Sequence, residues 1–139
     1  MTTTLSSKDR LIFALDVPDK SEAQRLVTLL RDSVGCFKVG LELFVREGPD
    51  ILKLIKDHSS AEIFLDLKLH DIPATVRGAL RSAAKLGVKY ITIHSTEGEA
   101  ILETSKEVKD SGLEVLAVTL LTSMGEAQLH DLGSNLKVD

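Results

Sequence analysis

Three ionisable side chains of alternating charge, Asp66, Lys68 and Asp71, lie close together at the end of an apolar segment. Residues 62–68 are predicted to form a β-strand, in which successive side chains point to opposite faces. Asp66 and Lys68 therefore share one face, and the leucines beside them share the other. A carboxylate and an ammonium held side by side at the carboxyl end of a strand can perform acid–base chemistry. Because α/β proteins place their active sites at that end, this segment is the first candidate for a catalytic site.

A purely structural role explains this segment less well. Asp71 is not expected to cap the following helix, because Pro73 suits the first helical position and makes Ile72 the cap residue. Asp66 and Lys68 are an alternative candidate for a structural ion pair. Buried charges are costly, however, and an apolar pair would fill the same place at lower cost. The sequence thus favours a functional role for both charges.

Five apolar, β-branched segments alternate with segments of helical periodicity. The predicted strands are Leu11–Leu15, Cys36–Leu41, Glu62–Lys68, Tyr90–His94 and Leu113–Thr122. The predicted helices cover approximately residues 20–32, 42–57, 73–86, 97–110 and 125–132. Strands that alternate with helices form βαβ units, so we expect a parallel sheet within an α/β fold.

Polar side chains occur at or near one end of every predicted strand. They are Asp16, Lys38, Asp66 and Lys68, His94, and Thr119 and Thr122. An open doubly wound sheet usually has a glycine-rich phosphate loop after its first strand, but residues 16–19 contain no glycine. A site assembled from many strand ends is instead typical of a TIM, or (β/α)₈, barrel.

The length of the chain allows only part of such a barrel. A complete barrel takes about 250 residues, and this chain of 139 residues accommodates about five β/α units. We expect residues 1–139 to be a single domain, apparently truncated at its C-terminal end. Alternatively, a second copy of the chain completes the sheet.

Composition excludes several classes of protein. The net charge is −4, no block of basic residues occurs and aromatic residues make up 4%, so we expect no nucleic-acid partner. No apolar run is long enough to span a membrane, and the N-terminus lacks an apolar signal core. The single cysteine, Cys36, cannot form an internal disulfide and is predicted to be a small core residue. These features favour a cytoplasmic location.

Asp16, Lys38 and the motif Asp66-x-Lys68-x-x-Asp71-Ile-Pro-x-Thr75 closely resemble the orotidine 5′-phosphate decarboxylase family. The long motif is highly specific, and the resemblance covers essentially the whole chain. It implies a barrel enzyme that uses neither cofactor nor metal to convert orotidine 5′-phosphate into UMP and CO₂, the last step of de novo UMP synthesis. It also implies a homodimer, in which Asp71 and Thr75 reach the site of the neighbouring subunit.

The resemblance further implies a role for each site residue. Lys68, Asp66, Asp71 and Lys38 are expected to be catalytic, with Lys68 as the proton donor and Asp66 against the carboxylate of the substrate. Asp16, Lys38, Thr75, Thr122 and Ser123 are expected to bind the substrate. Lys38 would pair with Asp66 and reach the ribose, whereas Asp16 would bind ribose hydroxyls. The phosphate-binding residues of the family come from strands later than Asp139.

Several alternatives remain open from the sequence. A sugar-phosphate decarboxylase or synthase on the same barrel shares the Asp-x-Lys-x-x-Asp pattern and typically uses a metal. A half-barrel without activity is the other alternative. Among single residues, Asp16 also suits a turn, Thr122 and Ser123 suit a loop, His70 suits a spacer within the motif, and His94 suits a hydrogen-bonded strand end.

Overall fold

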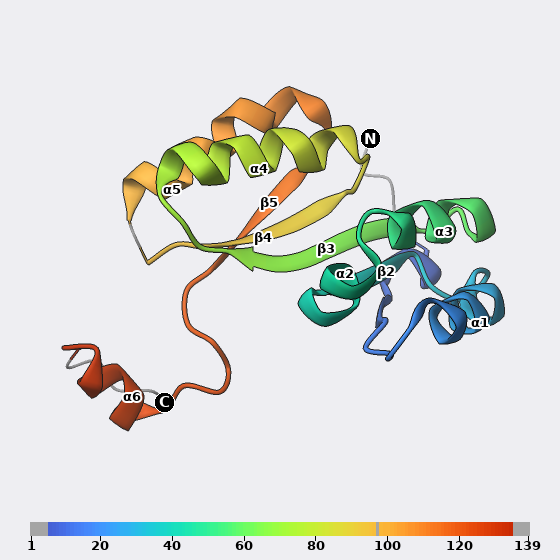
Figure 1. Cartoon of the computed structure of the whole chain (residues 1–139), viewed down its shortest axis with the longest axis horizontal. Helices are drawn as coiled ribbons and strands as arrows, with labels where there is room; N and C mark the ends of the chain where they lie inside the picture. Colours follow the sequence, from blue (N-terminus) through green and yellow to red (C-terminus); the bar gives the residue numbers. More distant parts are fainter. Residues whose placement is uncertain (1–5, 97, 135–139) are drawn as a thin grey trace.

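A computed structural model describes residues 6–96 and 98–134 of the chain, and its centre is a five-stranded parallel sheet (Figure 1). The strands lie side by side in the order of the sequence, each parallel to the next. They are β1 (Ile12–Ala14), β2 (Cys36–Gly40), β3 (Glu62–Leu69), β4 (Tyr90–His94) and β5 (Glu114–Val118). This is the arrangement of the first five β/α units of a TIM barrel, as predicted.

Helices connect the strands. The α-helices are α1 (Lys20–Leu30), α2 (Leu41–Glu47), α3 (Asp50–His58), α4 (Pro73–Lys85), α5 (Glu99–Glu103) and α6 (Glu126–Asp131), and the 3₁₀ segments are η1 (Lys8–Arg10) and η2 (Thr104–Ser111). Figure 1 shows α4 running along the sheet beside β4, whereas α6 lies away from the sheet at the end of an extended segment. None of the helices in residues 6–96 and 98–134 is long and apolar enough to cross a membrane.

Local sequence signals explain where two of these helices begin. The carboxylate of Asp19 accepts a hydrogen bond of 2.9 Å from the backbone N–H of Glu22, which caps α1. Pro73 is the first residue of α4 and Ile72 is its cap residue, as predicted.

Three predicted elements were wrong in extent. The helix expected over 42–57 is two helices, because Gly48 adopts φ +60° and Pro49 follows it. The helix expected over 97–110 is a short α-helix followed by 3₁₀ turns, and residue 97 lies outside the described residues. The fifth strand ends at Val118 rather than Thr122.

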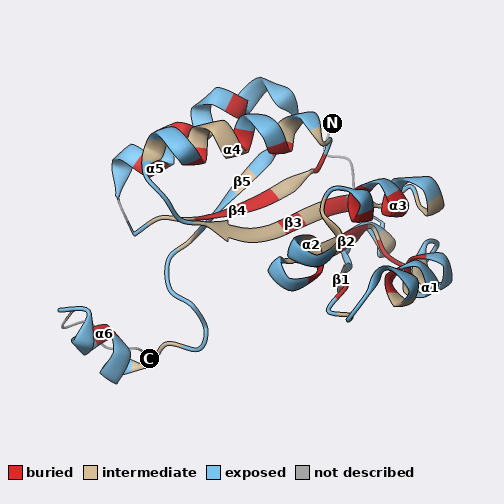
Figure 2. Ribbon diagram, viewed as in Figure 1, coloured by how far each residue is buried: buried red, intermediate tan, exposed pale blue. Residues whose placement is uncertain are grey.

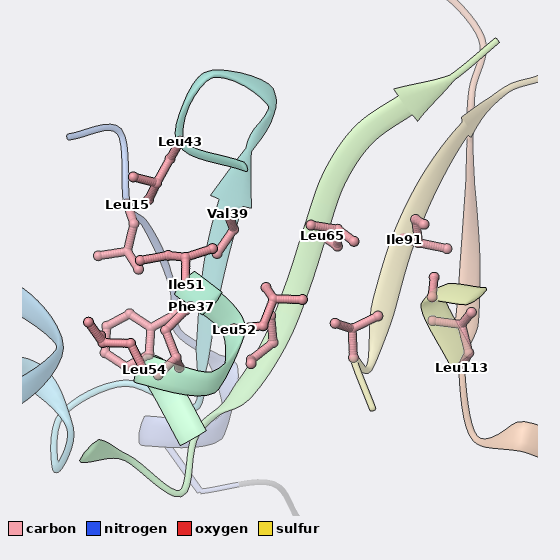
Figure 3. Close-up of a cluster of buried hydrophobic side chains, with 14 of the residues drawn as sticks. Leu15, Phe37, Val39, Leu43, Ile51, Leu52, Leu54, Leu65, Ile91 and Leu113 are labelled. Atoms are coloured by element: carbon pink, nitrogen blue, oxygen red, sulfur yellow. The ribbon is translucent and has the colours of Figure 1, made fainter. Parts of the chain in front are cut away.

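The two faces of the sheet differ in character. One face, which we call the helix-covered face, carries Phe37, Val39, Ile63 and Leu65, each at most 1% exposed and part of the hydrophobic core. Figure 2 shows that buried residues lie on both the strands and the helices. Figure 3 shows Phe37, Val39 and Leu65 in this cluster. The opposite face, which we call the open face, carries the side chains that alternate with these. They include Lys38, Phe64, Asp66 and Tyr90. In a closed barrel this face lines the interior.

Candidate functional site

The candidate site lies at the carboxyl end of β3, where the pairing with β4 is irregular. Leu65 pairs with Ile91 and Leu69 pairs with Ile93, so Asp66, Leu67 and Lys68 together lie opposite one residue of β4. Such a bulge redirects side chains and often occurs beside active sites. Lys68 has φ +50° and is the only non-glycine residue with positive φ in the described part of the chain. A backbone of this kind is strained and persists only where its surroundings hold it.

A hollow of about 470 Å³ lies at the carboxyl ends of β1, β2 and β3. We call it the strand-end hollow. Its lining is Leu15, Asp16, Val17, Pro18, Lys38, Gly40, Leu41, Glu42, Leu43, Asp66 and Lys68. The four charged residues predicted at the mouth of the sheet, Asp16, Lys38, Asp66 and Lys68, thus lie around the same space.

These four charges alternate in sign around the hollow. The ammonium of Lys68 donates to both carboxylate oxygens of Asp66, at 2.8 and 2.9 Å. The ammonium of Lys38 lies 3.6 Å from the Asp66 carboxylate and 3.5 Å from that of Asp16. The side chain of Asp66 is 13% exposed, whereas those of Lys38, Lys68 and Asp16 are 23%, 40% and 72% exposed. The central carboxylate is therefore the most enclosed member of the chain of charges.

Thr92, on β4, is a site residue that the sequence analysis missed. Its side chain is on the open face and the residue is 5% exposed. The hydroxyl oxygen accepts from the backbone N–H of Lys68 at 2.9 Å, and the hydroxyl donates to Oδ1 of Asp66 at 2.8 Å. The only signal in the sequence was a polar residue within the apolar strand Tyr90–His94.

The ionised form of Asp66 is favoured by its neighbours. Burial by itself raises the pKa of a carboxyl group, because it penalises the charge. Hydrogen bonds from Lys68 and Thr92 and the positive charges of Lys68 and Lys38 act in the other direction and outweigh burial. The pKa of Asp66 is consequently lower than its ordinary value, so this carboxylate remains charged at neutral pH.

Asp71 and Thr75 lie outside the strand-end hollow. Both are exposed, and Ile72 between them is 65% exposed. The carboxylate of Asp71 accepts a 2.7 Å hydrogen bond from the N–H of Ile72, just before α4. This segment exposes both polar and apolar side chains to solvent, so another molecule can contact them.

Thr122 and Ser123 also lie outside the hollow, in the exposed segment between β5 and α6. Their predicted contact with the pyrimidine stays a prediction. His70 and His94 lie beside each other at the ends of β3 and β4, with ring centroids 4.8 Å apart. Cys36 is 4% exposed, and burial raises the pKa of its thiol to about 11, so it is the core residue that was predicted.

The acidic, histidine and cysteine side chains of residues 6–96 and 98–134 are dispersed. In this part of the chain no three His, Cys, Asp or Glu side chains are grouped so that they could hold a metal ion. Within the hollow, Asp16 and Asp66 each pair with an ammonium. The arrangement can stabilise negative charge beside Lys68 and supply a proton from it.

Comparison with known families and curated proteins gives a consistent result. Residues 9–139 match the family described as Orotidine 5′-phosphate decarboxylase / HUMPS family. The orotidine 5′-phosphate decarboxylase of Desulfosudis oleivorans is 49% identical over 127 residues, which are 91% of this chain and 51% of that protein. The protein of the same name from Carboxydothermus hydrogenoformans is 44% identical over 137 residues, covering 94% of this chain and 57% of its own length. The chain thus spans about half the length of these relatives.

Solved structures agree with the fold. The crystal structure of orotidine 5′-phosphate decarboxylase from Lactobacillus acidophilus matches with a TM-score of 0.77 and 32% identity, covering 91% of this chain and 60% of that one. An uncharacterized conserved protein from Geobacillus kaustophilus matches with a TM-score of 0.82 and 36% identity, covering 91% of this chain and 62% of that one.

Proposed function

Because the chain belongs to the orotidine 5′-phosphate decarboxylase / HUMPS family, we propose that the protein converts orotidine 5′-phosphate into UMP and CO₂. The product places the reaction in pyrimidine nucleotide synthesis. The observation that carries this proposal is the alternating chain of charges around the strand-end hollow, with the ammonium of Lys68 bound to the carboxylate of Asp66 at 2.8 Å.

Decarboxylation requires a group that stabilises the carbanion as it forms and then protonates it. When the bond between the pyrimidine ring and its carboxylate breaks, CO₂ leaves and the ring carbon keeps the electron pair. Lys68 donates a proton to that carbon, and its amine later regains a proton from solvent. Since an ammonium is a compact positive charge on a flexible stem, it also stabilises the negative charge as it develops.

The other residues of the hollow have supporting roles in this proposal. Asp66 lies against the carboxylate of the substrate and holds the ammonium of Lys68 through hydrogen bonds to both of its carboxylate oxygens. The ammonium of Lys38 lies between Asp66 and Asp16 and reduces the repulsion between the two carboxylates. In this proposal it also contacts the ribose. Asp16, the most exposed of the four, binds ribose hydroxyls.

We further propose that two copies of the chain assemble around the segment that begins α4. Asp71 and Thr75 are exposed and do not reach the hollow of their own chain, and the exposed Ile72 between them supplies apolar surface. A second copy placed there would bring Asp71 and Thr75 to the neighbouring hollow and bury Ile72. Thr122 and Ser123 remain candidates for contact with the pyrimidine.

The test is a direct assay of the purified protein with orotidine 5′-phosphate, measuring UMP formation and CO₂ release. We expect turnover that a chelator does not reduce. The family also includes sugar-phosphate enzymes that typically need a metal, so a parallel assay supplies 3-keto-gulonate phosphate with added Mg²⁺. Metal-dependent turnover of the sugar phosphate alone would overturn the proposal in favour of that class. A lack of turnover with both substrates would indicate a chain without activity.

A further inference from the structure

The bulge in β3 interrupts the regular pairing of Lys68 with β4. Three residues, Asp66, Leu67 and Lys68, lie opposite Thr92 alone, so the regular ladder is interrupted there. At this interruption, the N–H of Lys68 donates to the side-chain hydroxyl of Thr92 at 2.9 Å. Because a buried backbone N–H without an acceptor is costly, the hydroxyl oxygen of Thr92 stabilises this irregular conformation.

The direction of both hydrogen bonds of Thr92 follows from chemistry. A backbone N–H can only donate, so the hydroxyl oxygen accepts from Lys68. The ionised carboxylate of Asp66 can only accept, so the hydroxyl proton points to its Oδ1. A single hydroxyl group therefore connects the backbone of Lys68 to the side chain of Asp66.

The same hydroxyl limits how the Asp66 carboxylate can turn. Oδ1 receives Thr92 and Lys68, at 2.8 Å each, while Oδ2 receives Lys68 at 2.9 Å and lies 3.6 Å from the ammonium of Lys38. Thr92 is the uncharged donor of this set and belongs to the neighbouring strand, so it ties the carboxylate to β4. At 5% exposure, water has little access to compete with either bond.

From this geometry we propose that Thr92 is a positioning residue, whose hydroxyl sets the placement of Lys68 relative to Asp66 for the decarboxylation. The inference rests on the proposed function for its role in catalysis. Lys68 has a strained backbone with φ +50°, so its conformation depends on contacts that hold it. Loss of the hydroxyl removes the acceptor of the Lys68 N–H and, at the same time, one of the two donors to Oδ1 of Asp66. A displacement of about 1 Å in a catalytic group can reduce the rate about 100-fold.

The experiment compares three variants of the full protein by steady-state kinetics with orotidine 5′-phosphate. Thr92→Val keeps the shape of the side chain and removes the hydroxyl, whereas Thr92→Ser keeps the hydroxyl and removes a methyl group. Thr104→Val is the matched control, because Thr104 is 1% exposed and its hydroxyl donates to the carbonyl of Ile101, in the helical segment outside the site. We expect Thr92→Val to lower kcat roughly 10- to 100-fold with little change in KM, and the other two variants to stay within about threefold of the wild type.

Equal kcat values for Thr92→Val and the wild type would overturn the inference, as would an equal loss in Thr92→Ser. If Thr92→Val does not fold, Thr92→Ala compared with Thr92→Ser isolates the same hydroxyl, with the same two outcomes. Hydrogen exchange of the Lys68 amide separates this inference from the proposed function, because it needs no substrate. Exchange should accelerate in Thr92→Val and stay unchanged in Thr104→Val, whether or not the wild type turns over orotidine 5′-phosphate. Unchanged protection in Thr92→Val would show that the hydroxyl does not hold Lys68.

Discussion

The two faces of the central sheet follow different physical rules, although the same strands build both. On β3, Ile63 and Leu65 are each 1% exposed and pack into the helix-covered face. Phe64 and Asp66 alternate with them and point to the open face. On the first face, side chains are held by the exclusion of water, which has no preferred direction. On the open face, Asp66 is held by directional hydrogen bonds from Lys68 and Thr92, each 2.8 Å long.

This difference explains how a stable fold and the proposed catalytic site can occupy one strand. Burial on the helix-covered face provides the stability that holds a bulge, a strained lysine and a concentrated set of charges on the open face. Substitutions on the two faces should therefore have separable consequences. Changes on the helix-covered face should lower the free energy of unfolding, whereas changes around the hollow should lower activity.

The largest expected effect is on activity. Replacing Lys68 with alanine removes the proposed proton donor, and general acid catalysis typically contributes about 100- to 10,000-fold to a rate. We expect kcat for orotidine 5′-phosphate to fall by at least that range, while binding of UMP, measured by calorimetry, remains detectable.

Lys89 provides the matched control for Lys68. Its side chain is 31% exposed against 40% for Lys68, and its ammonium also pairs with a carboxylate, that of Glu114, at 2.6 Å. It lies at the other end of the strands, just before β4. Lys89→Ala should leave kcat nearly unchanged, and a loss equal to that of Lys68→Ala would mean that lysine pairing in general, and not the hollow, supports turnover.

The next effect is on stability, and two phenylalanines of adjacent strands test it. Phe37 is fully buried on the helix-covered face, whereas Phe64 lies half-buried on the open face. Phe37→Ala should lower the free energy of unfolding by about 3–5 kcal/mol, because it removes buried area and leaves a cavity. Phe64→Ala should cost clearly less. Denaturant unfolding of both variants measures the difference, and equal losses would show that the open face is as well packed as the other.

The third prediction concerns Gly35, just before β2, which packs closely against the backbone of Lys8 and Asp9. A methyl group added at Gly35 would lie 2.6 Å from the Cα of Asp9 and 2.9 Å from the carbonyl oxygen of Lys8. Gly35→Ala should therefore destabilise the protein by about 1–3 kcal/mol through overpacking. Gly78, in α4, has open space around it and is the control. Gly78→Ala should be neutral or stabilise by roughly 0.5–1 kcal/mol in thermal unfolding.

The sequence predicted the features that depend on pattern and missed those that depend on contact. Alternation placed Asp66 and Lys68 on one face, and strand and helix periods gave the parallel sheet. The break at Gly48 and the bulge opposite Thr92 depend on how two elements meet, which periodicity within one element does not describe. Thr92 itself was overlooked because a hydroxyl in a strand has no distinctive spacing. Its importance comes from the residues 24 and 26 positions away that it contacts.

The smallest expected effect is a pH-dependent contribution of Asp66 to stability. Its pKa is lower in the folded protein than the ordinary value of 3.8 for an aspartate. Its contribution should thus be fully present above about pH 5 and should disappear as the pH falls through the lowered pKa. Asp66→Asn removes this contribution, so the difference in free energy of unfolding between wild type and Asp66→Asn should shrink between pH 6 and about pH 3.

Leu65→Ala is the control for that titration, because Leu65 is the neighbour of Asp66 on the helix-covered face. Its cost comes from lost burial, so its difference from the wild type should stay constant over the same pH range. Other acidic groups titrate equally in wild type and variants and cancel from each difference. If the Asp66→Asn difference were constant with pH, the ionised carboxylate would not be favoured by folding. The hydrogen-bond donors around Asp66 would then orient the carboxylate without stabilising its charge. The open face would in that case differ from the helix-covered face in the directionality of its contacts and not in electrostatic stabilisation.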